Sequence, residues 1–354
     1  MNAYTHRLPS STSAQPATAE RSYRLRRQDA SRILSSGFEP SPRVSPGQVL
    51  VRVAAASLNY RDLLTMQEPA SESSALVPLS DCAGIVEAVG ADVSQWKPSD
   101  RVSPNFFPEW TEGRFSAAYL GRALGGGQTD GVLRGQLVIE ASALVAVPEH
   151  LSLAEAATLP CAGLTAWHAL FERGRLKAGD TVLVQGTGGV ALFGLQLASA
   201  AGARVIVTSS SDDKLARARA LGAWQTINYR RTPDWDRVAL DMTAGRGVDH
   251  ILELGGPDTY ERSINAVAPG GQIAQIGVLT GFGSQPNLLP LQFKNASING
   301  ICVGSVEQFQ RLNRFMSEKQ LHPVIDQSFG FEQVPEAYEH LRSAAHFGKL
   351  VIEL

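Results

Sequence analysis

The second half of the chain alternates short apolar strands with helices, and this rhythm limits the possible folds more than any other feature. From about Leu159 the segments TVLVQ, ARVIVTS, QTINY, HILELGG and QIAQIGVL have the pattern of strands, with helical runs between them. The strands are rich in Val and Ile and apolar on both faces, as strands of a buried parallel sheet are. The alternation predicts an α/β fold with an open, doubly wound parallel sheet.

The first half has a different pattern. GQVLVRVAAASL, CAGIVEAVG and LVIEASALVAVP predict strands, and a long Gly-rich loop precedes the last of them. The chain also ends on a strand-like KLVIEL. Residues 1–22 are rich in Ser, Thr, Ala and Pro, which predicts an extension without regular structure.

Composition excludes several functional classes. The 354 residues suffice for two domains, and the net charge of -2 comes without a long basic run, which argues against nucleic acid as a partner. No apolar run is long enough to predict a membrane helix. The three cysteines, Cys82, Cys161 and Cys302, form no CxxC motif. This usage indicates a reducing compartment, so we expect a cytoplasmic protein.

The stretch VLVQGTGGVA predicts a cradle for a dinucleotide phosphate. Gly186, Gly188 and Ala191 have the G-x-G-x-x-G/A spacing, between a buried strand and an apolar helix. Glycines let backbone N–H groups approach a pyrophosphate, and the helix N-terminus adds partial positive charge. Gly189 and Val190 complete the predicted cradle. The alternative is a tight turn that binds nothing.

The end of the second strand predicts the choice of cofactor. A fold that binds NAD usually carries an acid there, whereas this chain has Ser209 and Ser210. Small hydroxyl groups and Lys214 would accept a 2′-phosphate that an acid repels, and Tyr229 would cover the adenine ribose. We therefore predict NADP(H). The alternative for the serines is helix capping, and both roles are compatible.

Several motifs follow one another in an order that resembles a known family. They are SLNYRD, DCAGIVEAVG, ATLPCAGLTAW, GDTVLVQGTGGV, GGQIAQIGVLTG and HFGKLVIEL. From residue 23 to 354 the chain resembles the medium-chain dehydrogenase/reductase superfamily, in its quinone-oxidoreductase-like, zinc-independent branch. The resemblance implies a GroES-like β-rich substrate domain (23–158 and 303–354) and a Rossmann NADP-binding domain (159–302). It also implies a homodimer paired through the strand near SINGICVG.

The same resemblance assigns residues to the nicotinamide end of the cofactor. They are Thr165 beneath the ring, Gly277 and Val278 at a strand end that approaches it, and Ile301 and Val303 as backbone partners of the carboxamide. Lys349 resembles a lysine near the cofactor phosphates. A surface lysine is the alternative for Lys349.

Catalytic zinc is not expected. In zinc-dependent relatives, two ligand positions match Asn59 and Ser80 of this chain, and a neighbouring glutamate matches Asp81; only Cys161 falls near a ligand position. A catalytic zinc needs three protein ligands, and amide and hydroxyl groups are poor replacements for them. We therefore predict no metal site.

Without a metal, charge on the substrate oxygen has to be stabilised by other means. Quinones and α,β-unsaturated carbonyls delocalise that charge, so they are the favoured substrates. Asn59 would donate to the carbonyl oxygen and Tyr60 would stack or donate. The alternatives are a buried amide paired within the fold and a packing tyrosine. Three aromatic residues were also candidates for a substrate-stacking surface or for core packing: Phe106, Phe107 and Trp110.

Three functions remain open at the level of sequence. The first is an NADPH-dependent reductase of quinones or α,β-unsaturated carbonyls. The second is a zinc-independent, NADP-dependent alcohol dehydrogenase or aldehyde reductase. The third is a non-catalytic NADPH-binding protein with a structural or regulatory role, which a fold alone does not exclude.

Overall fold

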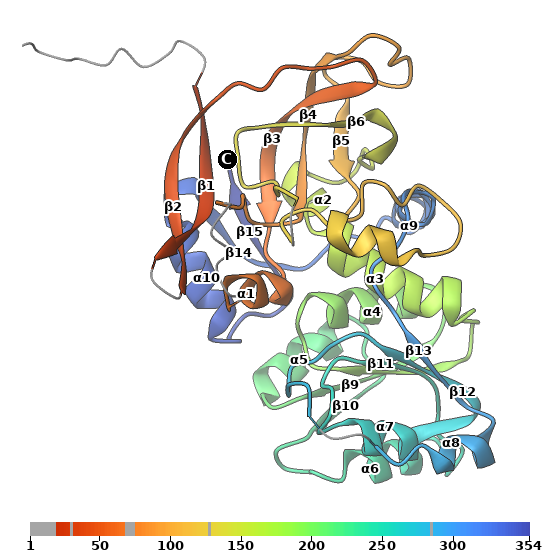
Figure 1. Ribbon diagram of the computed structural model, residues 1–354. Helices are drawn as coiled ribbons and strands as arrows, with labels where there is room; N and C mark the ends of the chain where they lie inside the picture. The colour runs from red at the N-terminus through yellow and green to blue at the C-terminus, as the bar shows by residue number, and fades with distance from the viewer. Residues whose placement is uncertain (1–18, 29–30, 68–74, 127–128, 284–285) are drawn as a thin grey trace, which may run out of the picture.

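The computed structural model describes residues 19–28, 31–67, 75–126, 129–283 and 286–354. Figure 1 shows a β-rich part above and a part with a parallel sheet flanked by helices below. The predicted α/β fold, with a β-rich part and a part built on an open parallel sheet, is confirmed. Among the described residues, no helix has both the length and the hydropathy that a bilayer crossing requires.

The upper part is a mixed sheet with strand order β14-β15-β3-β4-β5-β7, and β6 also pairs with β3. Its strands are β3 (Gln48–Ser57), β4 (Asp81–Val89), β5 (Arg101–Pro104), β6 (Gln136–Glu140), β7 (Leu144–Ala146), β14 (Ile325–Gly330) and β15 (Lys349–Glu353). In β3, Val49, Val51 and Val53 are buried while Arg52 is exposed, which is the period of two expected for a strand with one solvent face. The C-terminal strands β14 and β15 therefore complete the sheet of the N-terminal half, although the domain limits stay a prediction.

The lower part is a six-stranded parallel sheet with order β10-β9-β8-β11-β12-β13. Its strands are β8 (Thr181–Gln185), β9 (Arg204–Ser209), β10 (Gln225–Asn228), β11 (Val248–Glu253), β12 (Val267–Gln275) and β13 (Ser297–Gly300). Its helices are α4 (Gly189–Ala200), α5 (Asp212–Ala220), α6 (Trp235–Met242), α7 (Tyr260–Ala266) and α8 (Leu289–Lys294). Every residue of β8 is buried, as the apolar run in the sequence predicts.

The remaining helical segments lie beside the upper sheet or between the two parts. They are α1 (Tyr60–Gln67), α2 (Leu153–Ala156), the π-helix η3 (Leu159–Gly163), α3 (Leu164–Trp167), the π-helix η4 (His168–Arg173), α9 (Val306–Lys319) and α10 (Val334–Arg342), with short 3₁₀ segments η1 (Ala117–Arg122), η2 (Ala141–Ala143) and η5 (Phe331–Gln333). The π-helical turns η3 and η4 flank Thr165, and single π turns are common near functional sites.

The extension predicted over residues 1–22 needs one correction. Residues 1–18 lie outside the described residues, but Ala19–Ser22 belong to β1 (Ala19–Gln28), which pairs antiparallel with β2 (Ser31–Pro40). Tyr23 is buried, with its ring centroid 4.9 Å from that of Phe331. The strand therefore packs on the C-terminal part of the chain, a contact that no local pattern predicts.

Candidate active site

The glycine loop leaves its backbone open where a phosphate would bind. Gly186 has φ +79°, a conformation that favours glycine, and a Cβ atom at Gly186 or Gly188 would meet nothing within 4 Å. Gly188 precedes α4 and offers no side-chain cap, so no side chain in the cap accepts from the first N–H groups of α4. These features fit an anion at the helix N-terminus. Gly189 and the half-buried Val190 begin α4.

Ser209 and Ser210, which the sequence predicts to select the cofactor, lie at the end of β9 and directly after it. Ser209 is buried, and its carbonyl accepts from the N–H of Tyr229, which is exposed. The capping alternative falls on another residue, because Ser211 rather than Ser209 or Ser210 accepts from the N–H of Lys214 at the start of α5. The Lys214 ammonium donates to the carbonyl of Ala344 at 2.8 Å, which directs it toward the C-terminal segment.

Two arginines at this edge were missed at the level of sequence. Arg230 and Arg231 follow Tyr229 and are both exposed, and Arg231 forms an ion pair with Asp212. The Arg230 N–H donates to the Asn228 side chain, at the end of the strand that pairs with β9. The signal was available, since NYRR places two cations directly after the third strand of the sheet.

The residues assigned to the nicotinamide end lie mostly at the carboxyl edge of the parallel sheet. The N–H of Gly277 donates to the backbone carbonyl of Glu253, and a Cβ atom at Gly277 would lie 2.1 Å from the carbonyl oxygen of Leu254. Val278 follows Gly277 and is half-buried. The N–H of Ile301 donates to the carbonyl of Gln275, the last residue of β12. The tight approach explains why glycine stands at position 277.

Two further residues of that set lie where the parts of the molecule meet. Thr165 is buried in α3, and Val303 has the left-handed φ of +52°. The carbonyl of Val303 is 2.6 Å from Nδ1 of His168, and burial lowers the pKa of His168. A neutral His168 whose Nδ1–H donates to this carbonyl fits both observations, and it ties η4 to the segment after β13.

A buried carboxylate organises the loop after β11 and was also missed. Oε1 of Glu253 accepts from the N–H groups of Gly255 and Gly256 at 3.1 and 3.0 Å, and from the Thr259 hydroxyl. Oε2 accepts from Gln185 Nε2 at 2.7 Å and from Ser263. Because Gln185 directly precedes the glycine loop, this network fixes two neighbouring loops to each other. An acid within the apolar run ILELGG was the sequence signal.

Lys349 lies at the junction of the two parts rather than at the surface. It is 3% exposed, and its Nζ donates to the carbonyl of Leu58 at 2.6 Å and to Oδ1 of Asn59 at 2.5 Å. The preceding Gly348 donates its N–H to the carbonyl of Thr187 in the glycine loop. The structure therefore brings together two residues, Asn59 and Lys349, that the sequence assigned to different ends of the site.

The amide oxygen of Asn59 accepts from Lys349, whereas its amide nitrogen lies buried beside Asp81. Asn59 is 8% exposed, and its Nδ2 makes no hydrogen bond of normal geometry. Hydrogen bonding by the Asn59 side chain nevertheless lowers the pKa of Asp81, which means that Nδ2 faces this carboxyl. The backbone N–H of Asn59 donates to the Asp62 carboxylate, so Asp62 anchors the start of α1. Tyr60 begins α1 and is 41% exposed.

Asp81 accepts from several donors beside this pair. The Ser80 hydroxyl donates to Oδ1 at 2.6 Å and the Cys161 N–H donates to Oδ2 at 3.0 Å. Burial raises the pKa of Asp81, and the ammonium of Lys349 opposes that effect. Burial has the opposite effect on Lys349, because it lowers the pKa of the ammonium, while the charge of Asp81 raises that pKa.

The residues at the zinc-ligand positions do not form a suitable donor set. Oδ1 of Asn59 faces the ammonium of Lys349, and the hydroxyl of Ser80 is bonded to Asp81. Burial raises the pKa of the Cys161 thiol, which disfavours the thiolate that zinc binds. In the described part of the chain, no three His, Cys, Asp or Glu side chains are grouped to hold a metal ion.

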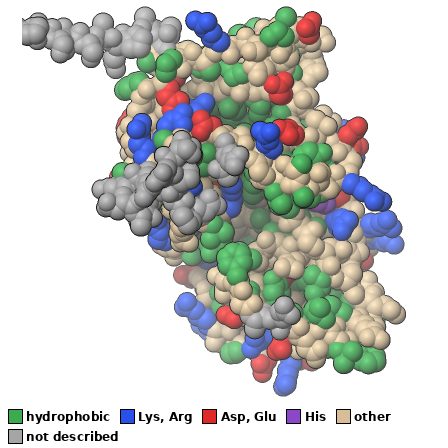
Figure 2. Space-filling model, viewed as in Figure 1, with side chains coloured by type: hydrophobic (Ala, Val, Ile, Leu, Met, Phe, Trp, Pro, Cys, Tyr) green, Lys and Arg blue, Asp and Glu red, His purple; other side chains and the backbone are tan. Residues whose placement is uncertain are grey.

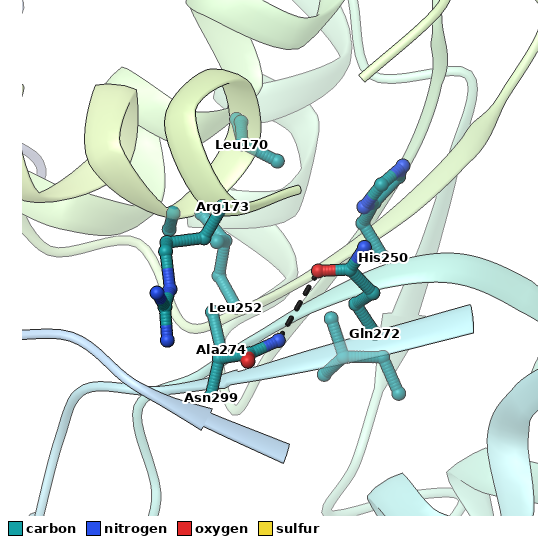
Figure 3. Close-up of a pocket in the computed structure, with 9 residues that line it drawn as sticks. Leu170, Arg173, His250, Leu252, Gln272, Ala274 and Asn299 are labelled. Atoms are coloured by element: carbon teal, nitrogen blue, oxygen red, sulfur yellow. Dashed lines mark hydrogen bonds between the residues drawn. The ribbon is translucent and has the colours of Figure 1, made fainter. Parts of the chain in front are cut away.

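Two other features do not form a substrate site. Phe106, Phe107 and Trp110 are buried in a core cluster, with the Phe106 and Phe107 ring centroids 4.7 Å apart, so core packing is the role that the structure gives them. Figure 3 shows a crevice between η4 and strands β11, β12 and β13, where Asn299 donates to Gln272 at 3.1 Å. This crevice is too narrow for a water molecule.

A Rossmann-like sheet with an open glycine loop, joined to a β-rich domain that carries a buried polar cluster, is an architecture typical of nicotinamide-dependent oxidoreductases. The comparisons agree. The alcohol dehydrogenase GroES-like domain model matches residues 45–149, and the zinc-binding dehydrogenase model matches residues 189–318. The chain belongs to the medium-chain dehydrogenase/reductase superfamily.

Two relatives illustrate the range of the family. A zinc-type alcohol dehydrogenase-like protein of Schizosaccharomyces pombe is 46% identical over 90% of this chain and 94% of its own length. A quinone oxidoreductase of Pongo abelii is 28% identical over 87% of this chain and 89% of its own length. Both are oxidoreductase-type proteins, and this chain is accordingly an enzyme of that class.

Solved structures give the same fold. The structure of a proposed alcohol dehydrogenase from Sinorhizobium meliloti 1021 has a TM-score of 0.90 at 43% identity, covering 96% of this chain and all of that one. An NAD-dependent alcohol dehydrogenase has a TM-score of 0.84 at 32% identity, with 94% and 99% coverage. A 2-octenoyl-CoA carboxylase reductase bound to NADP has a TM-score of 0.83 at 26% identity, with 96% and 88% coverage. A nicotinamide cofactor is thus supported; one of these relatives is described as NAD-dependent, and another was solved with NADP bound.

Proposed function

We propose that this enzyme is an NADPH-dependent, zinc-independent reductase of quinones or α,β-unsaturated carbonyl compounds. The observation that carries the proposal is the Asn59–Lys349 pair, in which an amide at a position that matches a zinc ligand of metal-dependent relatives accepts from a buried ammonium. When bound, the reduced nicotinamide supplies a hydride to a carbon of the substrate. The substrate oxygen then takes a proton from solvent or from Tyr60, whose side chain is exposed beside Asn59.

The proposed role of Asn59 rests on its amide nitrogen, Nδ2. Nδ2 is buried beside Asp81 without a hydrogen bond of normal geometry, and a buried donor in that state is costly unless a ligand completes it. A carbonyl oxygen is a suitable acceptor, and its charge grows as hydride arrives. Quinones and conjugated enones spread that charge over further atoms, so one amide donor and a nearby cation suffice for them.

NADPH is proposed over NADH because of the residues at the end of β9. Ser209 and Ser210 offer no carboxylate to repel a 2′-phosphate, and Arg230 adds an exposed cation at the same edge. Lys214 and Tyr229 remain further candidates for this contact. For the rest of the cofactor we retain the glycine loop, Thr165, and the residues of the sheet edge as proposed contacts.

A second function keeps support from one observation, since the relative that is 46% identical is described as alcohol dehydrogenase-like. A zinc-independent, NADP-dependent alcohol dehydrogenase or aldehyde reductase is the alternative. The test is cofactor consumption measured with quinones, enones, aldehydes and alcohols side by side. The proposal expects the highest kcat/KM for a quinone or an enone, and a preference for a simple alcohol or aldehyde would replace it by the alternative.

We further propose that the enzyme is a homodimer and acts in the cytoplasm. β13 is the last strand in the order of its sheet. Exposed hydrophobic side chains occur in α8 and in the segment between β12 and α8; they are Leu279, Phe282, Leu288, Leu289 and Phe293. Figure 2 shows green side chains at the lower right, where Figure 1 places α8. Phe282 and Phe293 are 81% and 80% exposed, which suits an interface between copies. Light scattering would give the mass of a dimer if this holds and of a single chain if it does not.

A further inference from the structure

The Lys349 side chain connects the glycine loop to Asn59. Lys349 begins β15, directly after the contact between Gly348 and Thr187. Its stem passes over the start of α4, because a Cβ atom built on Gly189 would lie only 2.6 Å from Cδ of Lys349. The ammonium at the end of the stem reaches Asn59. One side chain therefore touches the predicted phosphate cradle along its stem and the substrate domain at its tip.

We propose that Lys349 is a positioning residue for the reaction: its ammonium holds Oδ1 of Asn59 and so fixes the amide with Nδ2 as the donor to the substrate oxygen. We call the contact from Lys349 Nζ to Asn59 Oδ1, 2.5 Å long, the amide clamp. The inference rests on the proposed function, since the clamp matters for turnover only if Asn59 meets the substrate.

The ammonium decides which way the amide faces. The two ends of an asparagine amide have nearly the same shape, but one end accepts hydrogen bonds and the other donates. An ammonium carries three donors and no acceptor, so only Oδ1 is compatible with the position of Lys349 Nζ. A reversed amide would set two donors against each other in a buried place, which is costly. Nδ2 is consequently the end of Asn59 that faces away from the ammonium, and no hydrogen bond of normal geometry occupies it.

The clamp also makes the amide a stronger donor. When Oδ1 accepts from a cation in a region of low dielectric, the amide is polarised and its N–H groups donate more strongly. The carbonyl of Leu58 gives the ammonium a second acceptor, and Asp81 offsets its charge. The positive charge of Lys349 thus acts on the substrate through the Asn59 amide and needs no metal. Asn59 itself stands at a position that resembles a zinc-ligand position.

The clamp and the cofactor-phosphate role that the sequence suggested for Lys349 make different predictions. A phosphate contact would lower NADPH affinity when removed and leave turnover intact at saturating cofactor. A clamp would lower kcat and leave NADPH affinity nearly unchanged. The clamp also acts through Asn59, so its loss should not matter once Asn59 is gone.

The experiment is a double-mutant cycle on the full chain with Lys349→Met, Asn59→Ala and the double variant. With the best substrate of the panel, we expect Lys349→Met to lower kcat at least tenfold and to change the NADPH Kd less than threefold. The double variant should have a kcat within threefold of Asn59→Ala alone. Lys97→Met removes an exposed lysine outside the site and is the matched control. If Lys349→Met does not fold, the same cycle is run with Asp81→Asn added, which removes the carboxylate left without its cation.

If the two substitutions lower kcat independently, so that their effects multiply in the double variant, the clamp is overturned. A tenfold weaker NADPH Kd in Lys349→Met, with kcat restored at saturating NADPH, would also overturn it. A second readout is independent of activity: with ¹⁵N-labelled lysine, the buried ammonium should give a slowly exchanging NMR signal. That signal should vanish in Lys349→Met, shift in Asn59→Ala and stay in Lys97→Met. An absent signal, or one indifferent to Asn59→Ala, overturns the clamp as well. If every substrate fails with wild-type enzyme while the signal behaves as expected, the proposed function is wrong and the contact itself stands.

Discussion

Replacing Asn59 by alanine removes the proposed donor and one of the two acceptors of the Lys349 ammonium. Losing one preorganised donor to a developing oxyanion costs about 10²–10³ in rate in known cases. Because conjugated substrates delocalise part of the charge, we expect kcat/KM to fall roughly tenfold to a thousandfold. NADPH affinity should change little, because Asn59 belongs to the substrate domain rather than to the glycine loop.

The same change has a separate cost in stability. A hydrogen bond to a charged group contributes about 2 kcal/mol, so the Tm of Asn59→Ala should fall by roughly 4–8 °C. Asn313→Ala is the matched control, because Asn313 is also a buried asparagine, and its Nδ2 donates to the carbonyl of Ala146 at 2.9 Å. The control should lose about 1 kcal/mol of stability and keep its turnover.

The assay measures Tm, NADPH affinity by fluorescence and steady-state kinetics on one preparation of each variant. The reasoning is refuted if Asn59→Ala is folded, binds NADPH and turns over at the wild-type rate. The donor would then have to be Tyr60 or a backbone N–H group.

Three further changes test other parts of the site. Ser209→Asp should narrow or reverse a preference for NADPH over NADH, measured by fluorescence titration of both cofactors; tighter binding of NADH by the wild type would contradict the proposed selectivity. Burial raises the pKa of Asp62 to about 6, so its burial destabilises the fold progressively as pH rises from about 4 to about 6. The difference in unfolding free energy between Asp62→Asn and wild type, measured in urea, should therefore favour the variant by up to roughly 3 kcal/mol more at pH 7 than at pH 4. An equal difference at both pH values would refute this. Glu253→Gln turns an acceptor of the Gly255 and Gly256 N–H groups into a partial donor, so it should cost about 1–3 kcal/mol and weaken NADPH binding; unchanged affinity would show that the loop does not depend on this network.

Local patterns predicted the parallel sheet well. The buried strand β8, the glycine loop and α4 follow one another in the sequence, and their apolar periodicity and glycines specify them locally. The N-terminal strand β1 was not predicted, because its charged pattern acquires meaning only from distant partners. Arg24, for example, pairs with Glu39 and Asp130.

The candidate site was predicted only in part for the same reason. Asn59 was chosen for its position in SLNYRD, and it does lie in a buried polar cluster. Nothing in the sequence indicated that Lys349, 290 residues away, would donate to it. Equally, the motif around Ser209 predicts the edge of a cofactor site, but the capping role belongs to Ser211, since capping depends on where the helix begins.

The most direct test of the central claim is turnover by metal-free enzyme. Protein treated with a chelator, and shown by elemental analysis to hold no zinc, is mixed with NADPH and a quinone or enone while the absorbance of NADPH is followed. The account predicts full activity, unchanged by added zinc, and slower oxidation of NADH. Activity that is absent until zinc is added, with one zinc bound per chain, would contradict it.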